Sequence, residues 1–382
     1  MSWRTKEWEN LVLEVENFRK RYDENIFYVD GEEDIIEKFN DLGIETRKID
    51  INKINNKCEI EKKIIIISSE SALKTGFIKR KCSKLNLKEN EDYYIINNYN
   101  KKDFMSNIFP LLFLKMNNEV FLPRIQITLT SRCTLKCKNC CNGCNYWDKT
   151  DKSNDLTKKE IKKTFDALFS KVKYVNNIKI LGGEPFLCQD TLSYMLMLLK
   201  KRYKNRYFKI TIDTNATIIP SKKIIDILKR DNITLCVSDY RHSVKNLSNK
   251  YGELISTLKK EKIKFVSYHE INRWKEHKMF ETKDDREDIT KKIRRCFVEN
   301  KYFNSPEIHI DKMYLCAIGY NKMRSLKMDT SNIYCLDLSN ISSKEEILKY
   351  YMALDEKWTF QGCRYCNGLD SDFIVAAIQE GD

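Results

Sequence analysis

The sequence is poor in the residues that build linkers and low-complexity segments. It has only 11 glycines and 5 prolines in 382 residues, and it contains no internal repeat. Long linkers and repetitive architectures are therefore excluded. A chain of this length, with a hydrophobic fraction of 42%, should fold into two or three globular domains.

Long apolar segments are also missing. The best apolar run, residues 108–114, is too short to span a membrane. The first residues, Met1-Ser-Trp-Arg-Thr-Lys-Glu, are charged and lack the apolar core of a signal peptide. We therefore expect a cytoplasmic protein without a membrane partner, in which thiols stay reduced.

Histidine is scarce, and positive charge is in excess. The four histidines are unclustered, so no histidine metal site is evident. The net charge of +14 would suit nucleic acid, but the lysines are scattered as on a solvated surface. No basic patch with interleaved aromatic residues stands out, so we expect no nucleic-acid partner.

The most informative of the 14 cysteines are Cys133, Cys137 and Cys140, which form a C-x3-C-x2-C run. The run follows an alternating segment, residues 124–130, that predicts a β-strand. Thiolates this close together suit a soft metal centre, and iron–sulfur clusters are held by such ligands. A cubane has four irons and the loop supplies three thiolates, so one iron is open to another ligand.

A second motif, Leu181-Gly182-Gly183-Glu184-Pro185, ends another apolar strand about forty residues after the cysteines. Two glycines at a strand end let backbone approach a ligand closely, because no Cβ intervenes. Glu184 is an acceptor for an ammonium group. A structural metal site has no use for such an acceptor, which argues against a purely structural iron–sulfur or zinc module.

Together the two motifs resemble those of the radical S-adenosylmethionine (SAM) enzymes. The resemblance implies that the three loop cysteines bind three irons of a [4Fe–4S] cluster and that the fourth iron binds SAM. It also implies that the G-G-E-P motif binds the SAM amino group. An electron donor such as flavodoxin or ferredoxin is implied as a partner.

Strand and helix patterns alternate through residues 123–290. Strands are predicted at 124–130, 177–181, 207–214, 232–238 and 262–268, with helices between them, for example at 158–169 and 192–200. This alternation fits the partial (β/α) barrel of radical SAM enzymes. Barrels of this kind place their chemistry at the carboxyl ends of the strands.

Further candidates lie at those strand ends. Asn215 and Ser238 resemble family positions that hold the SAM carboxylate and ribose, although Asn215 could equally cap a turn. Two positions depart from the family pattern: Asn139 stands where an aromatic residue is usual, and Ala216 where glycine is usual. Cys236 shares a strand face with Ser238, so it could donate a hydrogen atom to a substrate radical, or be a core residue.

Residues 1–122 are predicted to form a separate Rossmann-like α/β domain. Helices are expected at 8–18, 32–42 and 72–85, and strands at 25–29, 44–51, 63–68 and 93–96. The first βα turn, Asp30-Gly31-Glu32, is not G-x-G-x-x-G. We therefore do not expect this domain to bind a dinucleotide.

The last part of the chain, residues 291–382, combines an alternating segment at 307–315, which predicts a β-hairpin, with four spaced cysteines: Cys296, Cys316, Cys363 and Cys366. This pattern resembles the twitch domain, a shortened SPASM domain that carries one auxiliary [4Fe–4S] cluster. The resemblance implies that these four cysteines hold that cluster. Cys335 lies in a predicted strand and is expected to be a small buried residue, although it could replace Cys296 as a ligand.

A zinc ribbon is the alternative interpretation of the paired cysteines. It would use two C-x2-C pairs, Cys137 with Cys140 and Cys363 with Cys366. Zinc ribbons usually separate their pairs by about 15–20 residues. The gap here is far longer, and Cys133 would have no role, so the sequence favours clusters.

The resemblance therefore implies a radical SAM oxidoreductase. Relatives with one auxiliary cluster include aminoglycoside-precursor dehydrogenases and carbohydrate epimerases, so our first hypothesis is oxidation or epimerisation of a sugar-like small molecule. The second is modification of a ribosomally made peptide, by crosslink or thioether formation. Peptide maturases often carry an N-terminal winged-helix domain, which the α/β pattern of residues 1–122 does not resemble.

Overall fold

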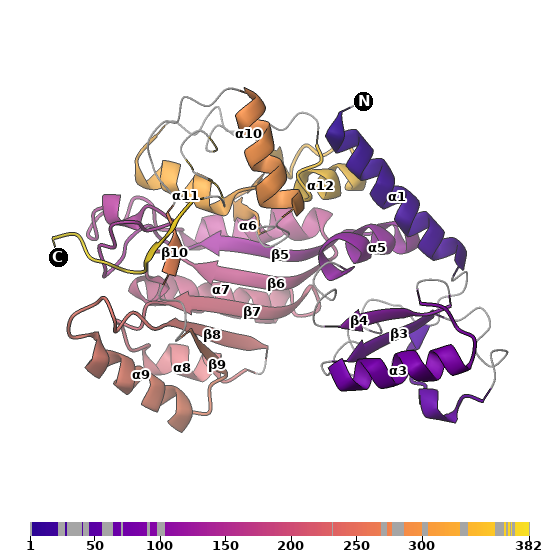
Figure 1. Ribbon diagram of the computed structural model, residues 1–382. Helices are drawn as coiled ribbons and strands as arrows, with labels where there is room; N and C mark the ends of the chain where they lie inside the picture. The colour runs from indigo at the N-terminus through magenta and orange to yellow at the C-terminus, as the bar shows by residue number, and fades with distance from the viewer. Residues whose placement is uncertain are drawn as a thin grey trace. The chain divides into compact units, whose positions relative to one another are not determined.

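A computed structural model describes most of the chain. The described residues are 2–21, 27–28, 40, 46–55, 64–69, 72–89, 92–97, 104–230, 232–268, 273–276, 286–299, 305–328, 335–355, 363, 366, 368 and 371–381. The chain divides into two compact units, residues 1–117 and 118–382 (Figure 1). Among the described residues, no helix is long and apolar enough to cross a membrane.

The first unit contains a four-stranded sheet in the order β2-β1-β3-β4, and every described strand pair is parallel. Its strands are β1 (Phe27–Tyr28), β2 (Thr46–Arg47), β3 (Ile64–Ser69) and β4 (Tyr94–Asn97). Its helices include α1 (Trp3–Arg21), α3 (Ala72–Lys84) and α5 (Phe109–Asn117), the last preceded by a π-helical turn, η3 (Phe104–Ile108). Of the helix expected at 32–42, all but residue 40 lie outside the described residues. The Rossmann-like assignment of this unit stays a prediction.

The second unit is built on an eight-stranded sheet in the order β13-β12-β11-β5-β6-β7-β8-β9. Five consecutive strands of this sheet are all parallel and end at the edge strand β9: β5 (Phe121–Thr128), β6 (Tyr174–Leu181), β7 (Tyr207–Thr214), β8 (Ile233–Ser238) and β9 (Phe265–Tyr268). These are the strands that the sequence predicts for residues 123–290. The mixed α/β class with a mainly parallel sheet is therefore confirmed.

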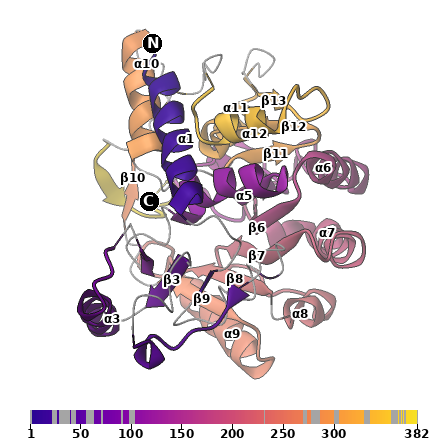
Figure 2. The same ribbon diagram turned by 90° about the vertical axis from the view of Figure 1, so that its right-hand side faces the viewer.

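Helices follow these strands, as the alternating pattern predicts. They are α6 (Lys158–Lys171), α7 (Gln189–Arg202), α8 (Lys222–Leu228) and α9 (Leu247–Lys260). Figure 2 shows α6, α7 and α8 in a row along one side of the sheet. The first of them begins at a capping box, because the Thr157 hydroxyl accepts from the Glu160 N–H and the Glu160 carboxylate accepts from the Thr157 N–H.

Strand register gives the sheet two different faces. One row across β5 to β8 is apolar and fully buried: Ile127, Ile180, Ile212 and Leu235. The adjacent row, on the opposite face, is polar: Gln126, Lys179, Thr211 and Thr234. Because side chains alternate between faces, the polar residues of these strands line one surface together.

A β-hairpin extends the sheet beyond β5. It consists of β11 (Glu307–His309) and β12 (Lys312–Tyr314), and β13 (Leu336–Asp337) pairs with β12. Strand β11 pairs with β5 through Glu307 and Gln126. This confirms the hairpin predicted at 307–315, while the domain divisions at 122/123 and 290/291 stay predictions.

The remaining elements of the second unit are short. Its helices are α10 (Arg286–Ile293), which continues into the π-helical turn η6 (Arg294–Glu299), α11 (Ala317–Ser325) and α12 (Lys344–Tyr351). There are also two 3-10 turns: η4 (Cys144–Tyr146) follows the cysteine motif, and η5 (Pro185–Cys188) begins at the last residue of the G-G-E-P motif. A separate two-stranded pair joins β10 (Arg273–Lys275) to β14 (Phe373–Val375).

Candidate active site

The cysteine loop lies at the carboxyl end of β5. The side chains of Cys133, Cys137 and Cys140 pack into one small cluster together with Leu135, Ala377, Tyr240, Val244 and Trp274. Burial raises the pKa of the Cys137 thiol to about 12, and the neighbouring Cys140 and Cys141 sulfurs add to the effect. The structure therefore brings together the three cysteines that the sequence singled out. It adds two aromatic residues, Tyr240 and Trp274, for which the sequence gives no role.

The cysteine loop is seated on the two glycines that follow β6. Thr130 and Arg132 accept backbone hydrogen bonds from Gly183 and Glu184, both at 2.9 Å. A Cβ at Gly183 would lie 2.2 Å from the Arg132 carbonyl oxygen and 2.7 Å from the Cys133 Cβ. A Cβ at Gly182 would lie 2.9 Å from the Thr130 oxygen. In the structure, the backbone of the cysteine loop packs directly against these two glycines, in the space that a Cβ would otherwise occupy.

Glu184 is fully buried beside the loop. Its carboxylate accepts hydrogen bonds from the Asn215 N–H at 2.9 Å, the Phe186 N–H at 3.1 Å and the Thr214 hydroxyl at 3.0 Å. Burial raises its pKa to about 7, against the lowering effect of these donors. A carboxylate has about four acceptor positions, so three donors leave room for one more. Pro185 begins η5 directly after Glu184.

Asn215 both caps a turn and faces the cysteine loop. Its amide oxygen accepts from the Thr217 N–H at 3.1 Å, and its amide nitrogen lies 3.4 Å from the Cys133 sulfur and 3.1 Å from the Thr134 hydroxyl. The next residue, Ala216, has φ +63°, in the left-handed region that favours glycine. The departure from Asn-Gly in the sequence therefore leaves an alanine in a conformation suited to glycine.

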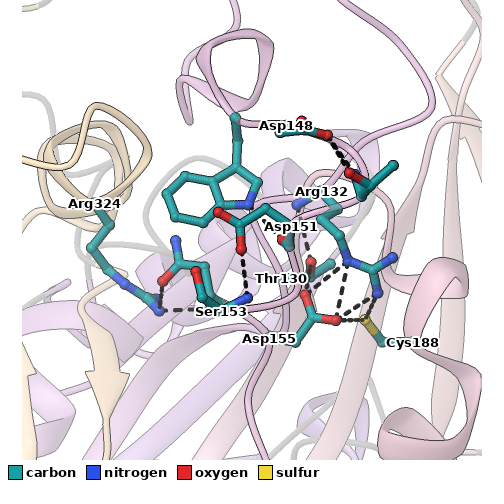
Figure 3. Close-up of polar contacts among 11 residues, drawn as sticks. Thr130, Arg132, Asp148, Asp151, Ser153, Asp155, Cys188 and Arg324 are labelled. Atoms are coloured by element: carbon teal, nitrogen blue, oxygen red, sulfur yellow. Dashed lines mark hydrogen bonds and ion pairs between the residues drawn. The ribbon is translucent and has the colours of Figure 1, made fainter.

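An ion pair holds the start of the cysteine loop (Figure 3). The Arg132 guanidinium lies 2.5 Å from the Asp155 carboxylate, which also accepts from the Thr130 hydroxyl at 2.5 Å. The Cys188 sulfur completes the group, 3.2 Å from Arg132 and 3.3 Å from Asp155. This network cannot be predicted from the sequence, because its members come from separate segments whose proximity only the fold determines.

A second buried carboxylate lies where the hairpin joins the sheet. Glu307 is fully buried and accepts from the Thr128 N–H at 2.6 Å and from its hydroxyl at 2.9 Å. The Asn321 amide, from α11, donates to Thr128 at 2.8 Å. Burial raises the pKa of Glu307 to about 7. These contacts link β11 and α11 to the strand that leads into the cysteine loop.

Helix α11 also carries a buried cation between the two sets of cysteines. Lys322 is 2% exposed, and burial lowers its pKa, while the sulfurs of Cys366, Cys141, Cys140 and Cys316 act in the opposite direction. A Cβ at Gly143, in the cysteine loop, would lie 3.3 Å from the Lys322 Cα. The lysine is therefore close to the loop and within electrostatic range of the second cysteine set.

The sulfurs of the second set of cysteines lie within electrostatic range of one another. Burial raises the pKa of Cys316 to about 12, with further contributions from the Cys366 and Cys296 sulfurs. The same neighbours, together with Cys316, act on Cys363. Cys335 lies elsewhere, and the groups that shift its pKa besides burial are Lys312, Tyr314, Asp337 and Asp311.

The polar face of the barrel sheet lies beside these motifs. An ion pair of 2.7 Å joins Lys179 of β6 to Asp213 of β7. Cys236 is opposite Asp213 in register, is 6% exposed, and its sulfur lies 3.6 Å from the Tyr268 hydroxyl. Ser238, at the end of β8, is half-buried and pairs in register with Tyr268.

The thiol set fits an iron–sulfur cluster. In a cubane each cysteine binds a separate iron, so the ligating thiols need only be close neighbours. The three neighbouring thiols of the loop, whose backbone packs against Gly183, satisfy that requirement.

Comparison with known proteins identifies this region. Residues 127–299 match the family model of the Radical SAM superfamily. The match covers less than half of the chain, and it supports the predicted radical SAM domain, with SAM and a [4Fe–4S] cluster as its cofactors. The auxiliary cluster stays a prediction.

Individual relatives are distant. GTP 3′,8-cyclase of Sulfurovum sp. (strain NBC37-1) is 32% identical over 119 residues, which cover 29% of this chain and 33% of that protein. The chain therefore matches only about a third of this curated relative's length. Solved structures include BtrN in complex with AdoMet and 2-DOIA, with 16% identity and a TM-score of 0.39 over 66% of this chain and 96% of BtrN. Another is Streptococcus suis SuiB bound to S-adenosylmethionine, with 15% identity and a TM-score of 0.34 over 77% and 81%. Likeness at this level identifies neither a substrate nor a reaction.

Proposed function

We propose that the protein is a radical SAM oxidoreductase that removes hydrogen from a sugar-like small molecule and thereby oxidises or epimerises it. The observation that carries the proposal is the close packing of the cysteine loop against Gly182 and Gly183. It joins the candidate cluster ligands and the candidate SAM-binding carboxylate, Glu184, into one site.

Different residues of this site would bind the cluster and the different groups of SAM. Cys133, Cys137 and Cys140 would hold the cluster, and Glu184 would accept a hydrogen bond from the SAM ammonium group at its remaining acceptor position. When bound, the cluster and SAM supply the superfamily chemistry, which is the reductive formation of a 5′-deoxyadenosyl radical. Asn215 and Ser238 would contact the rest of SAM.

The polar face of the sheet supports a small hydroxylated substrate. The Lys179 and Asp213 side chains are each about one-third exposed. Each can therefore form hydrogen bonds to a ligand while it keeps part of its contact with the other. Tyr268 adds a hydroxyl on the same face. A cation, a carboxylate and a phenol together offer donors and acceptors of the kind that sugar hydroxyls require.

Cys236 is the proposed hydrogen donor for an epimerisation. Its thiol lies on that polar face, in register with Asp213 and in contact with the Tyr268 hydroxyl. A thiol that returns a hydrogen atom to a substrate radical needs such a position. The thiyl radical that it leaves is restored to a thiol by a proton from solvent and one electron from the proposed flavodoxin or ferredoxin donor. In an oxidation, by contrast, the substrate radical loses a proton and an electron, and Cys236 is only a packed residue.

The second cysteine set is the proposed electron acceptor for an oxidation. Four cysteines that bind four irons leave no iron open to a substrate, so electron transfer is the simplest role for this cluster. The mutual influence of Cys296, Cys316, Cys363 and Cys366 supports this ligand set, and the different surroundings of Cys335 argue against its participation. Flavodoxin or ferredoxin is the proposed electron donor to the protein.

The test is a substrate screen with anaerobically purified protein, SAM and dithionite. We expect sugars or aminocyclitols to increase the formation of 5′-deoxyadenosine, which mass spectrometry quantifies. Deuterium from solvent in one product carbon, lost in Cys236→Ala, indicates epimerisation, and a product lacking two hydrogens indicates oxidation. Stimulation by peptides alone would overturn the substrate class in favour of peptide modification.

A further inference from the structure

A segment remote from the radical SAM domain in sequence lies along the cysteine loop. After β14, residues 376–380 run antiparallel to residues 136–138, where Cys137 and Gln379 form an isolated β-bridge. The Lys138 N–H donates to the Ile378 carbonyl at 2.8 Å, and the Glu380 N–H donates to the Lys136 carbonyl at 2.7 Å. The segment therefore adds a short strand to the loop that carries the candidate cluster ligands.

The Gln379 side chain points its amide nitrogen at one of those ligands. Its Nε2 lies 3.2 Å from the Cys137 sulfur and 2.7 Å from the Ala377 carbonyl oxygen. Its Oε1 accepts from the Lys136 N–H at 2.8 Å. A backbone N–H can only donate and a carbonyl can only accept, so these two contacts fix which end of the amide faces the sulfur.

We propose that Gln379 donates a hydrogen bond to the Cys137 sulfur when this cysteine binds the cluster, and that this bond raises the reduction potential of the cluster. The inference rests on the proposed function, because it requires a cluster at Cys133, Cys137 and Cys140. Hydrogen bonds to ligating sulfurs are one of the factors that set cluster potentials.

The sign follows from charge. One-electron reduction of the cluster by an external donor adds negative charge, part of which falls on the cysteine sulfurs. An N–H aimed at a sulfur therefore stabilises the reduced form more than the oxidised form. Cys137 is 7% exposed, and in such surroundings a hydrogen bond is electrostatically stronger than in water.

Glu380 provides a matched control on the neighbouring position. Its carboxylate accepts from the Asn145 amide at 2.8 Å and contributes negative charge near Cys137. Glu380→Gln keeps an acceptor for Asn145 but removes the charge. The two variants should therefore shift the potential in opposite directions, which a general loosening of the segment would not produce.

The experiment is a redox titration of the anaerobic full-length protein, followed by electron paramagnetic resonance. The cluster in question is identified as the one whose signal changes when SAM is added. We expect Gln379→Leu to lower the reduced-to-oxidised ratio at a fixed potential by up to about tenfold, a shift of up to about 59 mV for one electron. Glu380→Gln should raise the potential, because it removes a negative charge near Cys137. An unchanged potential in Gln379→Leu, or equal falls in both variants, would overturn the inference.

A second measurement covers the case in which Gln379→Leu fails to bind iron. Wild-type protein carrying glutamine labelled with ¹⁵N in its side chain should show a ¹⁵N coupling to the reduced SAM-sensitive cluster in pulsed paramagnetic resonance. Absence of that coupling would refute the hydrogen bond. Absence of any SAM-sensitive cluster in wild-type protein would instead refute the proposed function.

Discussion

Gly183→Ala tests whether the cysteine loop is seated on the G-G-E-P strand end as described. The added Cβ would lie 2.2 Å from the Arg132 carbonyl oxygen and 2.6 Å from the carbon of that carbonyl. Favourable contacts between such atoms begin near 3.5 Å, so the loop backbone must move by about 1 Å. That movement also breaks the 2.9 Å hydrogen bond from the Glu184 N–H to the same oxygen.

The two effects can be added. Overpacking costs about 1–3 kcal/mol, and the lost hydrogen bond costs about 0.5–1.5 kcal/mol. The variant should therefore be destabilised by roughly 2–4 kcal/mol. For a folded unit of this size, about 2–4 °C per kcal/mol translates into a fall in Tm of roughly 4–16 °C.

The assay is thermal unfolding of cluster-free protein, followed by circular dichroism, so that packing is separated from iron binding. Gly182→Ala should cost less, because the nearest atoms are 2.9 and 3.0 Å away and one belongs to the Thr130 side chain. Gly252→Ala is the control: it lies in α9, nothing lies within 4 Å, and alanine should stabilise the helix by up to about 1 kcal/mol. Equal Tm values for the Gly183 and Gly252 variants would refute the described seating of the loop.

Three further predictions concern other parts of the second unit. Ala216→Gly should be neutral or stabilising because φ is +63°, whereas Ala167→Gly within α6 should cost about 1 kcal/mol, as urea unfolding would show. Burial raises the pKa of Glu307 from 4.5 to about 7, so the folded state holds its proton more tightly. Wild-type stability should then fall relative to Glu307→Gln as pH rises from about 4.5 to 7, by on the order of 3 kcal/mol, and a pH-independent difference would contradict this. Cys363→Ala combined with Cys366→Ala should remove about four irons and stop oxidised-product formation while 5′-deoxyadenosine still forms; full product formation would show that the second cluster is not the electron acceptor.

Local patterns in the sequence predicted the elements of the second unit well. The alternation in residues 207–214 and the apolar run at 177–181 correspond to β7 and β6, because strand side chains alternate between a buried and a polar face. The motif cysteines were found for a similar reason, since Cys133, Cys137 and Cys140 are neighbours in sequence.

Contacts between distant segments could not be predicted in this way. Glu307 contacts Thr128 across 179 residues, and Gln379 contacts Cys137 across 242 residues. Neither Glu307 nor Gln379 belongs to a sequence motif. The sequence offers one signal, a Glu at the start of the segment predicted as a hairpin, Glu307, because a carboxylate that becomes buried in a sheet needs partners.

The most direct test of the radical SAM site compares the paramagnetic resonance signal of reduced protein with and without SAM. Wild-type protein should show a [4Fe–4S] signal that SAM changes, because three cysteine ligands would leave one iron of the cluster open to SAM. Replacement of Cys133, Cys137 and Cys140 by alanine should abolish the SAM-dependent change and reductive SAM cleavage, and about four irons should be lost. A SAM-dependent change that survives in the triple variant would contradict the assignment of this site.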